Sequence, residues 1–228
     1  PRLVQSSARS SEPGNLKPPR DLVGPKSHPT WVALEDTLDS QGQLLIFVGT
    51  RKSAESEALK LSKRVQKKLS KENPEKLDLF ASVVSSIEGG RQSAMADKLI
   101  ECLKGGTAFH HAGLTHSQRK IVEEAFKSGI ISCLTATPTL AAGVNLPARR
   151  VLVRDIKRWD DGMSRPLPVM EIRQMLGRAG RPKYDDFGEA WVLCKGTDGW
   201  EVADMVSEKY FFGEVEPIIS KLSGEPAL

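Results

Sequence analysis

Apolar residues recur along the chain in short runs and in longer segments with helical spacing. The short runs predict strands at residues 44–48, 107–110, 130–134, 151–153 and 189–193. Apolar residues three and four positions apart predict helices at 31–38, 53–71 and 94–103, and another that begins at Thr115. Because strands and helices alternate, the pattern predicts an α/β fold, a doubly wound parallel sheet with flanking helices and right-handed crossovers.

Local sequence patterns add detail to the prediction of two of these helices. In the helix at 53–71, one buried stripe is predicted from Ala54, Ala58, Leu61, Val65 and Leu69. Lysines cover most of the remaining surface, either as a solvated face or as a stripe that contacts nucleic acid. In the helix after 115, Gln118 follows Thr115 by three positions, which is the pattern of a capping box.

The two ends of the chain differ from its middle. Residues 1–29 are rich in Ser, Pro, Arg and Gly and lack apolar periodicity, so we expect an extended linker or lead-in there. Residues 30–200 hold all the predicted strands and are expected to form one domain. In the final segment, 201–228, the aromatic run Tyr210, Phe211 and Phe212 is expected to expose apolar surface.

Composition narrows the class of protein. Thirty-three Lys and Arg against 29 Asp and Glu give a formal net charge of +4, which suits an anionic partner without requiring one. Cys102, Cys133 and Cys194 lack metal-site spacing, so we expect no metal site and a reducing intracellular compartment. No apolar stretch reaches the roughly 18 residues of a membrane span, so a soluble protein without a membrane partner is expected.

The strongest candidate chemistry lies at residues 174–181. Gln174, Arg178 and Arg181 stand at i, i+4 and i+7, the spacing of one helix face. The planar fork of arginine grips phosphate oxygens, and an arginine beside a transferring phosphoryl group stabilises the charge that develops there. These residues therefore indicate either a polyphosphate ligand or a surface helix end with two solvated arginines.

A threonine-rich loop follows the strand predicted at 130–134. Thr135, Thr137 and Thr139 offer hydroxyls at alternate positions, at the carboxyl end of a strand where open α/β sheets bind ligands. Each hydroxyl is either a phosphate ligand or a turn-forming group that satisfies nearby backbone.

A β-ribbon is predicted near 154–169, where Asp161-Gly162 is a turn signal. Pro166 and Pro168 argue against a regular returning strand. Arg154, Lys157, Arg158 and Arg165 are available to phosphates, and Trp159 either stacks on a base or packs on its own domain.

Taken together, these segments resemble the second RecA-like domain of superfamily 2 helicases, within them the Ski-type group, and most closely the archaeal Hjm-type DNA repair helicases. Four segments carry the resemblance, in family order: 45–51 resembles motif IV, 108–114 motif IVa, 137–147 motif V and 174–182 motif VI. The resemblance covers roughly residues 30–228 and implies a P-loop NTPase-like helicase C-terminal domain.

The resemblance also implies a divided ATPase site. The chain has neither a Gly-x-x-x-x-Gly-Lys-Ser/Thr loop nor an Asp-Glu-x-His sequence, so ATP and Mg²⁺ are expected to be bound mainly by a first RecA-like domain that precedes residue 1. This chain alone is expected not to hydrolyse ATP. The expected roles here are arginine fingers for Arg178 and Arg181, a water-orienting amide for Gln174, and close approach to the nucleotide for Gly143, Asn145 and Gly177.

In the family, motifs IV, IVa and V line the path of single-stranded DNA. The resemblance makes Thr50, Arg51, His111, Gly113 and Thr137 candidate strand contacts. It places Arg158 and Trp159 on a hairpin that separates duplex strands. From the residues alone, His111 favours a structural or hydrogen-bonding role.

The function implied is that of the second motor domain of a 3′–5′ ATP-dependent DNA helicase in DNA repair or at stalled replication forks. Its implied partners are single-stranded and forked DNA, the first RecA-like domain, and a winged-helix domain that 201–228 would lead into. A cytoplasmic location is expected in an archaeon and a nuclear one in a eukaryote. The alternatives are a Ski-type RNA helicase domain and a non-catalytic RecA-like nucleic-acid-binding module.

Overall fold

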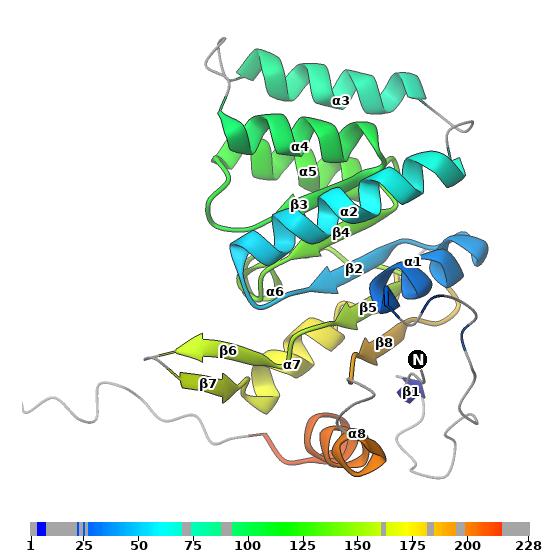
Figure 1. Cartoon of the computed structure of the whole chain (residues 1–228), viewed down its shortest axis with the longest axis vertical. Coiled ribbons are helices and arrows are strands. Elements are labelled where there is room, and N and C mark those ends of the chain that lie inside the picture. Colours follow the sequence, from blue (N-terminus) through cyan, green and yellow to red (C-terminus); the bar gives the residue numbers. More distant parts are fainter. Residues whose placement is uncertain are drawn as a thin grey trace, which may run out of the picture.

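A mixed β-sheet forms the centre of the computed structural model, which describes residues 4–7, 22, 25, 27–69, 74–87, 93–160, 163–181, 185–194 and 199–215. Within these residues the sheet has six strands in the order β1-β8-β5-β2-β4-β3 (Figure 1). The strands are β1 (Val4–Ser7), β2 (Leu44–Phe47), β3 (Thr107–His110), β4 (Cys133–Ala136), β5 (Arg150–Val153) and β8 (Glu189–Val192). All neighbours pair in parallel except β1, which runs antiparallel to β8. The α/β class and the parallel sheet predicted from the sequence are confirmed.

Helices flank this sheet. They are α1 (Pro29–Asp39), α2 (Arg51–Leu69), α3 (Pro74–Ile87), α4 (Ala94–Lys104), α5 (His116–Lys127), α6 (Thr139–Gly143), α7 (Val169–Leu176) and α8 (Gly199–Ser207), followed by the π-helix η3 (Glu208–Phe212). Helices α2 and α4 pack on β3, α7 packs on β5, and α3 lies farthest from the strands, beyond α4 (Figure 1).

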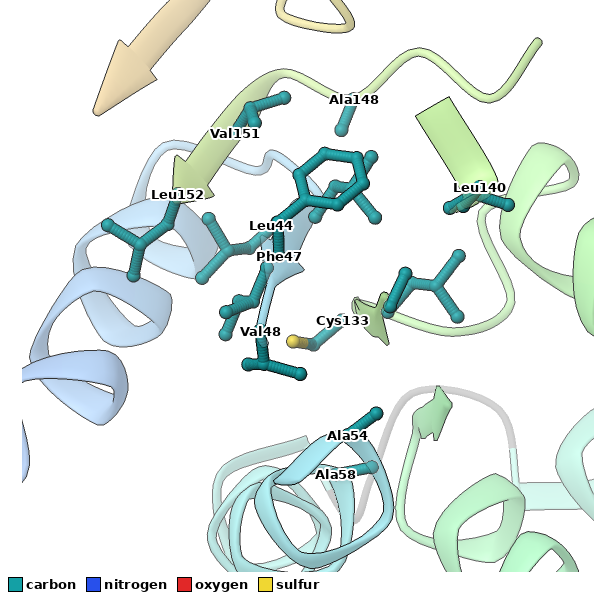
Figure 2. Close-up of a cluster of buried hydrophobic side chains, with 14 of the residues drawn as sticks. Leu44, Phe47, Val48, Ala54, Ala58, Cys133, Leu140, Ala148, Val151 and Leu152 are labelled. Atoms are coloured by element: carbon teal, nitrogen blue, oxygen red, sulfur yellow. The ribbon is translucent and has the colours of Figure 1, made fainter. Parts of the chain in front are cut away.

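The core lies where α2 meets the central strands. All residues of β2, β3, β4 and β5 are buried, as expected of parallel strands covered on both faces. Figure 2 shows Leu44 and Phe47 of β2 above the small side chains of Ala54 and Ala58, which face the sheet from α2. The Thr135 hydroxyl donates to the Ala54 carbonyl at 2.7 Å, so that a strand hydroxyl ties the helix to the sheet.

The capping box predicted at the start of α5 is present. The Gln118 N–H donates to the Thr115 hydroxyl at 3.2 Å, and the Thr115 N–H donates to the Gln118 side chain at 2.9 Å. These two bonds satisfy backbone donors that the helix itself leaves without partners.

Strand β4 begins three residues later than the predicted 130–134, at Cys133. The N–H groups of Ile130 and Ile131 both donate to the Ala125 carbonyl, at 3.1 and 3.3 Å, and so close the end of α5. Thr135 consequently lies inside β4 and not in the loop after it.

Only part of the segment 1–29, expected as an extended lead-in, lies within the described residues. Val4–Ser7 form β1, which pairs with β8 from Val4↔Val192 to Ser7↔Glu189, and α1 already begins at Pro29. Leu22 is buried in the core, with 8% of its surface exposed. Most of the other residues of this segment lie outside the described part of the chain.

A two-stranded antiparallel ribbon is present between β5 and α7, as β6 (Lys157–Asp160) and β7 (Met163–Pro166). It projects away from the sheet (Figure 1). Pro166 pairs with Lys157 at the end of the ladder, where a missing N–H is tolerated, so the prolines do not prevent pairing. The predicted turn at Asp161-Gly162 lies outside the described residues.

A buried ion cluster joins α1 to the sheet. The Arg150 guanidinium contacts Glu189 of β8 and, at 2.7 Å, Asp36 of α1, and it lies 3.8 Å from the centroid of the Trp191 ring. The Arg150 side chain is 3% exposed. Burial is the main influence on its pKa and lowers it, while the two carboxylates oppose that shift.

The last described segment is fastened to α7. The Arg173 guanidinium donates to the backbone carbonyls of Tyr210 (3.2 Å), Phe211 (3.4 Å) and Gly213, and the Tyr210 hydroxyl donates to the Leu167 carbonyl at 3.1 Å. The exposed aromatic run expected at 210–212 is therefore wrong for Tyr210, which is buried, whereas Phe212 is 53% exposed.

Candidate functional site

An open groove of about 730 Å³ lies at the carboxyl ends of β2, β3 and β4. It is lined by Gly49, Thr50 and Arg51 after β2, Ala112 after β3, Thr137, Pro138 and Thr139 after β4, Arg158 of β6, and Leu167, Pro168, Met170, Glu171 and Gln174 at and before α7. Open α/β sheets bind their ligands at this edge. The groove is therefore lined by residues from all four motif-like segments. From the second segment, 108–114, only Ala112 is part of the lining, and His111 and Gly113 are not.

The start of α2 supplies positive character to the groove. The Thr50 hydroxyl accepts the Ser53 N–H at 3.1 Å and so caps the helix. Arg51, the first helical residue, is exposed. A helix amino terminus carries partial positive charge, and the arginine adds a full one, so both features attract phosphate.

Two of the three threonines, Thr137 and Thr139, line the groove, whereas Thr135 does not. The hydroxyls of Thr137 and Thr139 lie 2.9 Å apart, and both residues line the groove. Thr135 is fully buried, and its hydroxyl donates a hydrogen bond to the carbonyl of Ala54. Thr135 is therefore a structural residue and not a phosphate ligand.

The ribbon reaches the groove through Arg158. Its Nη1 lies 3.0 Å from Oε2 of Glu171 on α7, and its side chain remains 46% exposed. This ion pair holds a cation at the rim of the groove while leaving it accessible. The Trp159 backbone pairs with Ser164, but the Trp159 side chain lies outside the described part of the structure.

The His111 side chain does not reach the groove, contrary to the expected strand contact. It is fully buried, stacks on Phe109 with ring centroids 5.4 Å apart, and accepts the Gly113 N–H on Nδ1 at 3.1 Å. Burial lowers the pKa of His111, and nearby Glu55 acts in the opposite direction. His111 therefore holds the loop that carries Gly113, and the Gly113 N–H is already engaged.

The helix face predicted for Gln174, Arg178 and Arg181 is wrong, because α7 ends at Leu176. The Ala148 N–H donates to the Arg178 carbonyl at 2.9 Å, and the Gly180 N–H donates to the Ala148 carbonyl at 2.7 Å, so the chain leaves the helix to bridge a neighbouring loop. Gly180 adopts a φ of +92° that completes this exit.

The exit separates the three predicted residues. Gln174 lines the groove at the carboxyl edge of the sheet. Arg181 contacts Gln43, which directly precedes β2 and so lies at the opposite, amino edge. The structure therefore does not bring Gln174 and Arg181 to one site.

Arg178 joins the turn after α7 to the loop after α6. Its Nη1 donates to the Asn145 side chain at 3.0 Å, and its Nη2 donates to the carbonyl of Ala141. Gly177, Arg178 and Asn145 are therefore close together, and Gly143 lies on the same α6 segment as Ala141. The Arg178 Nε is buried without a hydrogen-bond partner.

Arg181 is held by Asp185, a residue that none of the four motif-like segments contains. Arg181 Nε and Nη2 donate to the two oxygens of Asp185, each at 2.9 Å, and Nη1 donates to the Gln43 side-chain oxygen at 2.8 Å. The one available signal was an acidic residue four positions after an arginine, which is too common to carry weight alone.

The donor sets of the two edges fit anions. Guanidinium groups and backbone turns at Arg178 and Arg181 suit the phosphates of a nucleotide such as ATP. Within the described ranges there is no group of three or more His, Cys, Asp or Glu side chains that could hold a metal ion. None of the helices described is long and apolar enough to cross a membrane.

Comparison with known proteins defines the class. Residues 60–183 match the family described as helicase conserved C-terminal domain, and the chain belongs to that family. The chain is also 45% identical over 194 residues to the ATP-dependent DNA helicase Hel308 of Methanocella arvoryzae, a match that covers 85% of the chain and 25% of that protein.

Two further relatives carry the same name. Hel308 of Pyrococcus horikoshii is 45% identical over 185 residues, covering 81% of the chain and 24% of the relative. Hel308 of Pyrococcus abyssi is 39% identical over 207 residues, covering 90% and 27%. The chain thus spans about a quarter of the length of these relatives, and the resemblance drawn from the four motifs is confirmed.

Proposed function

We propose that the chain is the second motor domain of an ATP-dependent DNA helicase that moves 3′ to 5′ and acts in DNA repair or at stalled replication forks. The observation that carries the proposal is the division of the motif residues between two polar sites. One is the groove at the carboxyl edge, and the other is the cluster around Arg178 and Arg181. Helix α7 and the turn after it connect the two sites, as a motor that couples nucleotide to strand requires.

The cluster beyond α7 is assigned to the nucleotide. ATP and Mg²⁺ are held mainly by a first RecA-like domain, while Arg178 and Arg181 approach the γ-phosphate from this domain. Gly143, Asn145 and Gly177 lie beside Arg178, and the two glycines have no side chain that would keep the nucleotide away from the backbone.

The groove is assigned to the strand. Thr50, Arg51, Thr137 and Arg158 contact backbone phosphates, with Gln174 in the polar lining, and Gly113 directly follows Ala112 of that lining. Such contacts fix the polarity of the strand and carry little sequence preference. The ribbon, with Trp159, meets the duplex, and η3 leads toward a winged-helix domain. The relatives are named as DNA helicases, which favours single-stranded and forked DNA over RNA.

Strand binding is tested with the chain itself by fluorescence anisotropy on labelled single-stranded DNA. The double variant Arg51→Ala, Arg158→Ala should bind about ten-fold or more weakly, because two phosphate contacts are lost. The matched control Lys104→Ala, Lys127→Ala removes the same charge from exposed helix ends away from the groove. Equal weakening in both variants would remove the groove from the strand path.

Nucleotide turnover is tested in an assembled motor, meaning the Methanocella arvoryzae relative with this chain in place of its matched segment. Arg178→Ala and Arg181→Ala should each lower DNA-stimulated ATP hydrolysis by about three orders of magnitude while DNA binding is retained. The chain alone should not hydrolyse ATP. Turnover that is indifferent to both substitutions would contradict the assignment of the arginines.

A further inference from the structure

Asp185 is a buried carboxylate at the centre of the Arg181 contacts. Its side chain is 4% exposed. Besides the two guanidinium bonds, its Oδ2 accepts the Arg181 N–H at 3.0 Å, and its own N–H donates to the Arg181 carbonyl at 2.9 Å. The two residues therefore fix each other through backbone and side chain alike.

A second arginine shares this carboxylate. Arg149 Nη1 lies 3.8 Å from Asp185 Oδ1, and the Arg149 guanidinium stands 4.0 Å from the centroid of the Phe187 ring. Burial opposes ionisation of Asp185, but the hydrogen bonds from Arg181 and the charge of Arg149 outweigh it and hold the pKa of Asp185 below its ordinary value. With two guanidinium groups on one carboxylate, the cluster keeps a net positive charge and remains attractive to an anion.

Gln43 fixes the other side of the Arg181 fork. The Gln43 side-chain nitrogen donates to the carbonyls of Phe126 and Ile131, both at 2.7 Å, which turns its oxygen toward Arg181. Gln43 is buried, and the two carbonyls lie in the last turn of α5 and in the segment between α5 and β4. The guanidinium is thus held from two directions, by Asp185 before β8 and by Gln43 directly before β2.

We propose that Asp185 is a positioning residue for Arg181: it binds the Nε–Nη2 edge of the fork side-on and so sets the direction in which Arg181 meets the nucleotide phosphates. The inference rests on the proposed function, in which Arg181 engages those phosphates. A long arginine side chain otherwise samples several rotamers, and orientation lost at that point lowers the rate of phosphoryl transfer. Arg149 serves as the counter-cation that keeps Asp185 from neutralising the site.

The first test compares Asp185→Asn with Asp186→Asn in the assembled motor. The neighbouring Asp186 is exposed, so its substitution is a matched control for the loss of one charge. Asp185→Asn should lower kcat about ten-fold or more, with the KM for DNA unchanged, whereas Asp186→Asn should stay within about two-fold of the parent. Equal kcat for the two variants overturns the inference.

The second test is chemical rescue, which a merely structural role would not produce. Millimolar guanidinium chloride should restore part of the turnover of Arg181→Ala, because Asp185 can hold the free cation side-on. It should not restore the double variant Arg181→Ala, Asp185→Asn. Rescue of both variants alike, or of neither, overturns the inference.

The outcomes separate this inference from the proposed function. Wild-type turnover in Arg181→Ala would overturn both, since Asp185 would position a group without a role. An inactive Arg181→Ala beside a fully active Asp185→Asn would overturn only the inference.

A third test uses NMR spectra of the chain alone, so that it gives a result even when the assembled motor is inactive. The Arg181 Nε–H signal in ¹H–¹⁵N spectra should be sharp in the parent and in Asp186→Asn, and it should broaden in Asp185→Asn. An unchanged signal in Asp185→Asn overturns the inference.

Discussion

Arg178 donates a hydrogen bond of 3.0 Å to the side chain of Asn145, a residue 33 positions earlier in the chain. The bond runs beside the Ala148–Ala179 bridge, so the loop after α6 and the turn after α7 are joined by both side chain and backbone. A displacement of one segment is therefore transmitted to the other.

This contact predicts non-additive effects on turnover. In the assembled motor, Asn145→Ala should lower kcat because Arg178 loses its orienting acceptor. The double variant Asn145→Ala, Arg178→Ala should be no slower than Arg178→Ala alone, since residues in contact do not contribute independently. Steady-state ATP hydrolysis measures all three variants. Multiplicative losses would show that Asn145 acts on the nucleotide by itself.

Gly143 and Gly188 predict opposite consequences of adding a methyl group. A Cβ at Gly143 would meet nothing within 4 Å, so Gly143→Ala should leave the fold intact and change its stability by about 1 kcal/mol or less. Its KM for ATP in the assembled motor should nevertheless rise if the nucleotide approaches α6. Unaltered KM would place the nucleotide elsewhere.

A Cβ at Gly188 would lie 2.2 Å from the Gly180 nitrogen, a contact that backbone must move to relieve. Gly188→Ala should therefore destabilise the chain by about 1–3 kcal/mol in urea unfolding. Stability equal to that of Gly143→Ala would contradict the close approach of the two backbone segments.

The buried ion cluster predicts a loss of stability. Glu189→Gln removes one of the two carboxylate partners of Arg150 while Asp36 remains, so the free energy of unfolding should fall by about 1–3 kcal/mol. Asp39→Asn breaks the exposed pair between Lys68 and Asp39 and should cost about 1 kcal/mol or less. Urea unfolding of both variants provides the comparison, and similar losses would mean that the Arg150 cluster is solvated.

The adjacent histidines predict acid sensitivity. Burial lowers the pKa of both His110 and His111 in the folded chain, while Glu123 and Glu55 oppose that shift. The unfolded chain then binds more protons in the window below the ordinary histidine pKa, so stability should fall as pH drops from about 7.5 toward 5.5.

The substitutions His110→Gln and His111→Gln together should flatten this part of the pH profile, measured as the free energy of unfolding at several pH values. His116→Gln, in an exposed position of α5, is the control. A profile that stays equally steep in the double variant would assign the acid sensitivity to other groups.

Local signals predicted most of the elements and the capping box, because apolar periodicity and capping are properties of neighbouring residues. The end of α7 was missed because it depends on Ala148, far away in sequence, as a backbone partner. The same holds for Thr135, whose strand position follows from the way Ile130 and Ile131 close α5.

In the candidate sites, too, local patterns predict some features, and contacts between distant segments determine the others. Thr50, Arg51, Thr137 and Arg158 reach one groove, as sequence order along a parallel sheet predicts. The burial of His111 and the grip of Asp185 on Arg181 depend on packing between distant segments, so no local pattern reveals them.

The attachment of η3 to α7 determines how a mechanical load enters the domain. A pull on the backbone beyond residue 213 meets the three carbonyls held by Arg173 and the anchor from Tyr210 to Leu167 before it meets any strand. The pull therefore acts on α7, which lies between the two polar sites, and on Leu167, which directly follows β7 of the ribbon. The sheet bears it only afterwards, as the rigid frame against which those parts are displaced.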